Sequence, residues 1–130
     1  METENQTGQE IQRIREAIRS AQRYSVQEIA EDFIIEGLAD GRYQAWDFDS
    51  CIVVTSVVSY ENFSNLRINH VAGELPDGLT ADILKKLENF ASAVGCKSVE
   101  IIGRRGWVRR LKDFGYNEQY VTVMKEINNE

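Results

Sequence analysis

The sequence is poor in the residue types that build metal centres, disulfide frameworks and fibrous chains. Its 130 residues include one histidine, two cysteines and one proline. His70, Cys51 and Cys96 are too few and too far apart for the usual zinc-ligand spacings, so we predict no metal site. One proline and nine glycines also exclude a low-complexity or collagen-like chain.

Long apolar runs are missing as well. No stretch approaches the roughly 18 consecutive apolar residues of a membrane helix. The opening residues METENQTGQE are polar and acidic, whereas a signal peptide is basic and then apolar. We therefore expect a cytoplasmic protein with no membrane span. Cys51 and Cys96 lie in or beside apolar runs, where buried reduced thiols are usual.

What is present is the composition of one globular domain. Hydrophobic residues make up 42% of the chain and charged residues 28%. Domains commonly run to roughly 100 to 200 residues, so this length fits one domain. We predict a polar N-terminal tail over residues 1–8 and a single domain over residues 9–130.

The net charge is −6, but the basic residues are concentrated. Residues 97–112 hold six basic residues and one acidic residue. The overall acidity argues against a protein that coats nucleic acid with its whole surface. The basic cluster can bind an acidic protein partner, including a second copy, or, less readily, nucleic acid; a solvated helix face is the alternative. The candidate partner-binding residues are Arg104, Arg105, Arg109, Arg110 and Lys112.

Hydrophobic periodicity predicts helices first and strands afterwards. Two capping boxes, opening at Thr7 and Ser25, predict a helix over about residues 8–23 and a second one that ends near Gly37 and Gly41. The runs RYQAWDF, CIVVTSVVSY and NLRINHVAG then read as an antiparallel meander of three strands.

The second half of the sequence predicts a strand, helix, strand arrangement. A long amphipathic helix follows Thr80 and ends at Gly95, and KSVEIIG is a short strand. RGWVRRLKDFG is a short helix that Gly115 closes and NEQYVTVMKEI is a final strand. On the short helix we expect Trp107, Leu111 and Phe114 to face inward.

This order resembles the GCN5-related N-acetyltransferase (GNAT) fold. The segment GCKSVEIIGRRGWVRRLKDFGY resembles the second half of that fold, and GRRGWVRRLKDFGY is similar to small GNAT-like proteins encoded beside structural genes in phages. The resemblance implies an α/β mixed sheet, built as an antiparallel meander followed by strand, helix and strand, with helices on both faces.

The resemblance also implies where acetyl-coenzyme A would bind. In the family, backbone amides at the N-terminus of the long helix hold its pyrophosphate. The residues that correspond here are Gly73, Gly78, Leu79 and Thr80. Glu74 and Asp77 would put negative charge at the pyrophosphate position, and Pro76 lacks an N–H donor. We therefore expect no cofactor; acetyl-coenzyme A is the cofactor if the loop is functional.

For the chemistry, the resemblance implies His70 as the base and Tyr116 or Tyr120 as the proton donor to the departing thiolate. Three functions remain open. We expect a phage-type GNAT-like protein with a degenerate loop, acting as a non-catalytic structural or interaction module, such as an internal virion protein. The alternatives are an active N-acetyltransferase for an unknown amine and a small nucleic-acid-associated factor that uses the basic helix.

Overall fold

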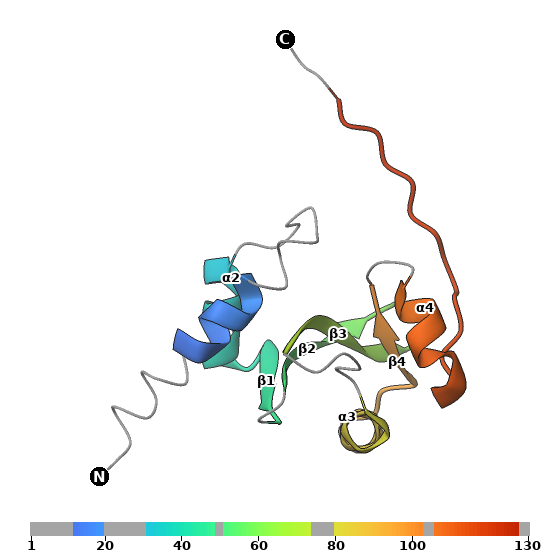
Figure 1. The fold of residues 1–130 in the computed structure, drawn as a ribbon, viewed down its shortest axis with the longest axis horizontal. Coiled ribbons are helices and arrows are strands. Elements are labelled where there is room, and N and C mark those ends of the chain that lie inside the picture. The colour runs from blue at the N-terminus through green and yellow to red at the C-terminus, as the bar shows by residue number, and fades with distance from the viewer. Residues whose placement is uncertain (1–11, 20–30, 49–50, 74–79, 103–105, 128–130) are drawn as a thin grey trace.

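The computed structural model describes residues 12–19, 31–48, 51–73, 80–102 and 106–127. Residues 12–19 are helical. They are followed by α2 (Glu31–Asp40), β1 (Tyr43–Asp47), β2 (Cys51–Ser59), β3 (Ser64–Gly73), α3 (Ala81–Ala93), β4 (Ser98–Ile101), α4 (Gly106–Leu111) and a 3₁₀ turn (Lys112–Phe114) (Figure 1). The predicted order is confirmed up to Phe114. The predicted tail over residues 1–8 and the two capping boxes lie outside the described residues.

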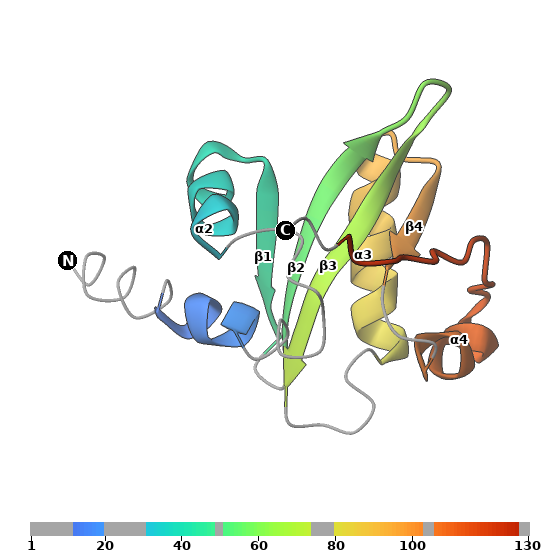
Figure 2. The ribbon, with the colours of Figure 1, turned by 90° about the horizontal axis from the view of Figure 1, so that it is seen from above.

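The four strands form one mixed sheet in the order β1-β2-β3-β4. β1 pairs with β2 and β2 with β3 in antiparallel fashion, which confirms the meander. β4 pairs with β3 in parallel, and α3 makes the crossover between them (Figure 2). Parallel neighbours need such a crossover because the chain must return to the same end of the sheet.

Helices cover both faces of the sheet, as predicted (Figure 1). The larger core lies between the sheet and α3. Its buried members are Cys51, Val53, Leu66, Ile68, Ile83, Leu84, Leu87, Ala91 and Leu111. The smaller core lies between β1, β2 and the two N-terminal helices, and its members are Ile18, Ile34, Tyr43 and Val54. Alternate residues of β2 thus enter opposite cores, as strand pleating requires.

Both ends of α3 follow the sequence prediction. Thr80 is the N-cap, and its Oγ1 accepts a hydrogen bond from the Ile83 N–H at 3.3 Å. At the other end Gly95 has φ of +82°. The N–H of Cys96 donates to the Ala91 carbonyl at 2.8 Å, which closes the helix in a Schellman turn.

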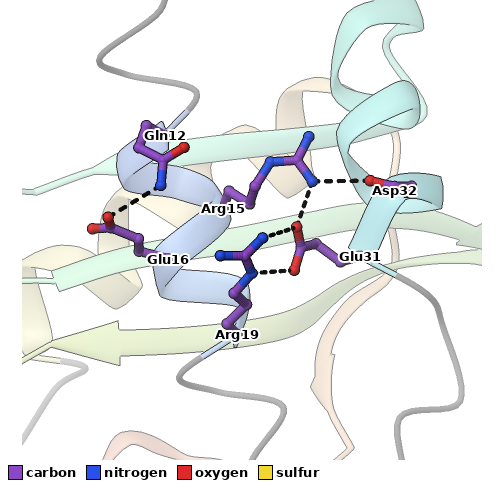
Figure 3. A network of polar contacts seen from close by, with 6 residues as sticks. All are labelled: Gln12, Arg15, Glu16, Arg19, Glu31 and Asp32. Carbon is purple, nitrogen blue, oxygen red and sulfur yellow. Dashed lines mark hydrogen bonds and ion pairs between the residues drawn. The ribbon is translucent and has the colours of Figure 1, made fainter.

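The helix over residues 12–19 is joined to α2 by ion pairs (Figure 3). Glu31 accepts hydrogen bonds from Arg15 and Arg19, and Arg15 also reaches Asp32 at 2.9 Å. These hydrogen bonds, from Arg19 and then Arg15, lower the pKa of the Glu31 carboxyl. The two helices therefore dock through an apolar contact at Ile18 and a charged contact beside it.

Two expectations for the C-terminal part were wrong. Residues 117–127 form no strand; they run away from the body of the protein (Figure 1) and all are exposed. Strand propensity measures fit to a pleated surface and does not supply a partner. Phe114 is 43% exposed and does not face inward with Trp107 and Leu111. Because Lys112–Phe114 wind as a 3₁₀ turn, with fewer residues per turn, Phe114 rotates away from the inner side.

Candidate functional site

The parallel junction of β3 and β4 is short. Pairing runs from Asn65↔Ser98 to Ile68↔Ile101 and ends there. β3 continues to Gly73, and among the described residues this extension is paired with β2 alone. Within the described ranges, the C-terminal end of β3 therefore has no strand partner on the side where β4 stops, and ligands of open α/β sheets bind at such strand ends.

A β-bulge lies at the start of this extension. Thr55 of β2 pairs with Ile68 and Val54 pairs with His70, so Asn69 is an additional residue in β3. The Asn69 Nδ2 donates to Ser56 Oγ at 2.9 Å. A bulge bends its strand and changes the direction of nearby side chains, and bulges are frequent beside active sites.

Glu100 on β4 is the centre of a polar network on the face of the sheet opposite the larger core. Its carboxylate accepts hydrogen bonds from the Tyr60 hydroxyl and the Asn65 amide, both at 2.8 Å, and from Arg67 Nε at 2.9 Å. Burial alone would raise the pKa of Glu100, but the three hydrogen bonds outweigh it and the pKa is lowered. Glu100 therefore carries a charge at neutral pH and neutralises Arg67.

A shallow hollow of about 400 Å³ adjoins the network, between α2 and β3. Its polar lining includes Arg42, Gln44, Ser56, Arg67 and Asn69. Both guanidinium groups face carboxylates outside the hollow, since Arg42 pairs with Asp40 at 2.8 Å and Arg67 with Glu100. Phe33, Tyr43, Val57 and Val58 also line the hollow, which is thus of mixed polarity and nearly neutral in charge.

Tyr116 is held in place on the other side of the molecule. Gly115, with φ of +89°, turns the chain, and the Tyr116 N–H donates to the Leu111 carbonyl at 3.2 Å. The Tyr116 hydroxyl then donates to Glu88 Oε2 on α3 at 2.9 Å. Burial, together with this hydrogen bond to a carboxylate, raises the pKa of Tyr116 far above its ordinary value.

The residues proposed for catalysis are not brought together. His70 lies opposite Val54, and directly opposed residues share a face, so His70 belongs to the α2 side of the sheet. Tyr116 packs against the larger core on the α3 side. Tyr120 lies in the C-terminal segment and is 89% exposed.

The proposed cofactor residues lie partly outside the described residues. Gly78 and Leu79 are among those not described, and Gly73 is the last residue of β3. Thr80 uses its own hydroxyl to accept the Ile83 N–H, and Asp82 adds a negative charge to the first turn of α3. Among the described residues at this helix end, one amide is therefore bonded within the chain and one carboxylate lies in the first turn, and both features disfavour binding of an anion.

The described part of the basic cluster is exposed, as predicted. Arg109, Arg110 and Lys112 all lie on the surface, while Arg104 and Arg105 fall outside the described residues. The Arg110 guanidinium stands 5.5 Å from the centre of the Trp107 ring, and that ring packs on the larger core. Cation–π contact of this kind fixes the orientation of a charged side chain.

The described segments offer neither a metal centre nor a membrane helix. No group of three or more His, Cys, Asp or Glu side chains in those segments can hold a metal ion. None of their helices is long and apolar enough to cross a membrane. Cys51 is buried, Cys96 is half-buried, and both are reduced thiols.

Sequence reasoning missed the structural roles of three residues, Glu88, Glu100 and Asn69. Glu88 looked like an exposed position on an amphipathic helix, and Glu100 like a polar residue in a short strand. Nothing in the sequence marks Asn69 as a bulge, because a bulge exists only relative to the partner strand. For Glu100, alternation with Val99 and Ile101 was the available signal, since it places this charge on the opposite face from the core.

No protein-family model and no curated protein matches the sequence. Solved structures do match the fold. A crystal structure of a probable acetyltransferase has TM-score 0.65 at 9% identity, over 94% of this chain and 95% of that one. A possible acetyltransferase from Clostridium difficile 630 has TM-score 0.56 at 12% identity, over 93% of each chain. A protein from Thermus thermophilus has TM-score 0.54 at 12% identity, over 89% of this chain and 94% of that one.

Identities this low compare folds and leave activity open. The shared elements nevertheless extend over almost the whole length of both chains in the first two pairs. The strand order, the parallel β3–β4 pair and the two-sided helical cover agree with that likeness. The chain therefore has a GNAT-like fold, a mixed α/β sheet with helices on both faces.

Proposed function

We propose that this protein uses a GNAT-like fold as a non-catalytic interaction module and does not transfer acetyl groups. The observation that carries the proposal is the position of Tyr116, whose hydroxyl is bonded to Glu88 on the α3 side while His70 faces the α2 side. A base and an acid that lie on opposite faces of the sheet are poorly placed to serve one reaction.

The raised pKa of Tyr116 also supports the non-catalytic proposal. A departing thiolate has a conjugate acid of pKa about 8.5, and an ordinary tyrosine has a pKa of about 10. Because the pKa of Tyr116 is raised further, proton transfer from it to a thiolate is strongly uphill. At the N-terminus of α3 the Ile83 N–H is already bonded to Thr80, and the sequence before the helix contains Glu74 and Asp77. Both features support the same proposal.

The interaction surface that we propose is the basic side of α4. Arg109 and Arg110 are exposed on α4, and Lys112 is exposed at the start of the 3₁₀ turn that directly follows it. A partner with an acidic surface would fit, and the first fifty residues of a second copy, with eleven acidic and five basic side chains, are one such surface. The contact would weaken as salt rises, because exposed charges are screened within about 10 Å at 0.1 M.

The finer proposal, a phage-encoded protein packaged in the virion, rests on the resemblance of GRRGWVRRLKDFGY alone. Its test is mass spectrometry of purified particles of the source phage. Peptides from this chain at constant stoichiometry with the capsid support the proposal. Their absence from particles, with the protein abundant in the infected cell, overturns it.

Acetyl-coenzyme A provides the direct test of the non-catalytic proposal. Thermal unfolding is measured with and without millimolar acetyl-coenzyme A. A ligand at 100 times its dissociation constant stabilises the folded state by about 2.7 kcal/mol, which raises the midpoint by several degrees. We expect no shift. A shift, or release of coenzyme A with a panel of amines, would show a functional loop and overturn the proposal.

The basic surface has a separate test with a matched control. Sedimentation at low and high salt is compared for the protein, for Arg109→Glu with Lys112→Glu, and for Lys85→Glu with Lys86→Glu. Both double variants change the charge equally, but Lys85 and Lys86 are on exposed positions of α3. We expect the α4 pair alone to abolish the salt-sensitive association. Equal effects would remove α4 as the interaction surface.

An active N-acetyltransferase is the second candidate, and one observation favours it. β3 extends past the end of β4, and the Asn69 bulge lies where the extension begins. Such an open strand end beside a bulge is suited to hold a ligand. The acetyl-coenzyme A experiment decides between the two. Retention on DNA that falls with salt would favour the nucleic-acid alternative.

A further inference from the structure

The C-terminal segment, residues 117–127, has the sequence of a strand but no strand partner among the described residues. All of its residues are exposed. The exposed apolar side chains are Tyr120 at 89%, Val121 at 62%, Val123 at 90%, Met124 at 71% and Ile127 at 69%. So many large apolar groups in solvent are costly and mark a surface that a partner covers.

The outer edge of β4 has features that complement those of residues 117–127. β4 is the last strand in the order, and its outer side has no paired strand in the described part of the chain. Val99 and Ile101 on β4 are half-buried against the larger core, whereas Leu66 and Ile68 on the neighbouring β3 are 0% exposed. The core is therefore incompletely covered at this edge. The opposite edge, at β1, is flanked by α2 in both views (Figures 1 and 2).

Residues 117–127 begin directly after a residue that is held in place by two hydrogen bonds. Tyr116, the residue just before it, is tied to Leu111 through its N–H and to Glu88 through its hydroxyl. Beyond this anchor the chain runs away from its own sheet in Figure 1. An anchored, outward-directed segment rich in β-branched and other apolar residues is suited to pair with another molecule, as in β-strand addition.

We propose that residues 117–127 of one copy add as a fifth strand to the free edge of β4 in a second copy. In this pairing Val121 and Val123 share one face of the added strand and cover the core beside Val99 and Ile101. Thr122 points to the opposite face, on which Glu100 of β4 lies away from the larger core. A two-fold symmetric dimer exchanges both segments and pairs the outer edge of β4 in each copy.

Strand addition goes beyond the proposed function and depends on a different force. The contact at α4 is ionic and weakens with salt, whereas strand addition rests on backbone hydrogen bonds and apolar burial. Sedimentation of the full chain in roughly 0.5 M salt therefore isolates it, because the Debye length there falls well below 10 Å. We expect a dimer under these conditions at concentrations of tens of micromolar, and protection of the amides of residues 119–125 from hydrogen exchange.

Charged substitutions give the decisive comparison. Val121→Lys with Val123→Lys places two ammonium groups on the face that covers the core, so we expect monomers at the same high salt. Thr122→Lys adds the same group to the opposite face and should leave the dimer intact. Because these positions are exposed in the single chain, all variants should keep the circular dichroism spectrum of the parent. A parent chain that stays monomeric, or a valine variant that still dimerises, overturns the proposal.

Discussion

Tyr116 and Glu88 join two elements that the sequence separates by 28 positions. The phenol hydroxyl donates to Glu88 Oε2 at 2.9 Å, and Tyr116 itself follows the turn at Gly115. The hydrogen bond fixes the end of α4 and its 3₁₀ turn onto α3, so that the larger core is closed at Leu111.

Tyr116→Phe should lower the free energy of unfolding by about 1 to 2 kcal/mol. The substitution keeps the ring but leaves the Glu88 carboxylate without its donor, and hydrogen bonds to charged groups contribute about 1.5 to 3 kcal/mol. Urea unfolding measures the change. Tyr120→Phe is the matched control, because its side chain is 89% exposed and a change within about 0.5 kcal/mol is expected. Equal losses in both variants would contradict the assignment.

Gly37→Ala should destabilise the protein although alanine is the better helix former. A Cβ at Gly37 would clash with Cδ2 of the Tyr43 ring, which is buried. Forced overpacking costs about 1 to 3 kcal/mol, which exceeds the propensity gain of about 1 kcal/mol. Thermal unfolding of Gly106→Ala is the control. No atom of the described residues lies within 4 Å of a Cβ there, so the midpoint should stay or rise. A rise in both variants would show that the ring moves freely.

The network at Glu31 predicts acid sensitivity. Hydrogen bonds from Arg19 and Arg15 lower the pKa of Glu31 in the folded protein, so the carboxylate binds its proton less readily there than in the unfolded chain. Its contribution is complete above the unfolded pKa of about 4.3 and is lost as pH falls through the lower folded pKa. Glu31→Gln should therefore be less stable than the parent at neutral pH, and the difference should shrink as the pH is lowered below that unfolded pKa.

Unfolding midpoints at neutral and at acidic pH measure this difference. Glu36→Gln, at an exposed position of the same helix, is the control and should leave the pH dependence of the parent unchanged. A gap between parent and Glu31→Gln that stays constant across this range would remove Glu31 as the source.

Cys51 should resist alkylation in the folded protein. Burial, and to a smaller extent Asp47, raises the pKa of its thiol, and the side chain is 2% exposed. Because the thiolate is the reactive form, iodoacetamide at mildly alkaline pH should modify Cys51 only after unfolding. Cys96, half-buried and also of raised pKa, should react first. Peptide mass spectrometry with time distinguishes the two, and faster labelling of Cys51 would contradict its placement in the core.

The fold followed from the sequence wherever one element carries its own signal. Thr80 and Gly95 bound α3 as predicted because capping and left-handed turns are local. The three strands of the meander were equally clear, since runs rich in β-branched and aromatic residues are separated there by turn-forming groups. The strand predicted at residues 117–127 failed for the opposite reason. Its β-branched and aromatic residues are typical of a strand, but a strand also needs an edge, and no local pattern says which edge is available.

The candidate site was less accessible to sequence reasoning. His70 and Tyr116 were chosen for their chemistry, and the face on which each lies depends on ladder register and on the turn at Gly115. The bulge at Asn69 places two consecutive residues against a single partner, a relation that exists only once β2 and β3 have paired. Glu88 and Glu100 acquire partners from distant segments, and tertiary pairing of this kind leaves no local pattern in the sequence.

The parallel β3–β4 pair also sets an order for folding. β1 to β3 close through short turns, but Glu100 meets Tyr60 from 40 positions along the chain, after α3 has crossed the sheet. Closing the longer loop costs more chain entropy, so we expect β4 to join after the meander has formed. The same edge would be the first to detach under partial unfolding, which makes the β4 side the point where local opening, proteolysis and strand exchange between molecules begin.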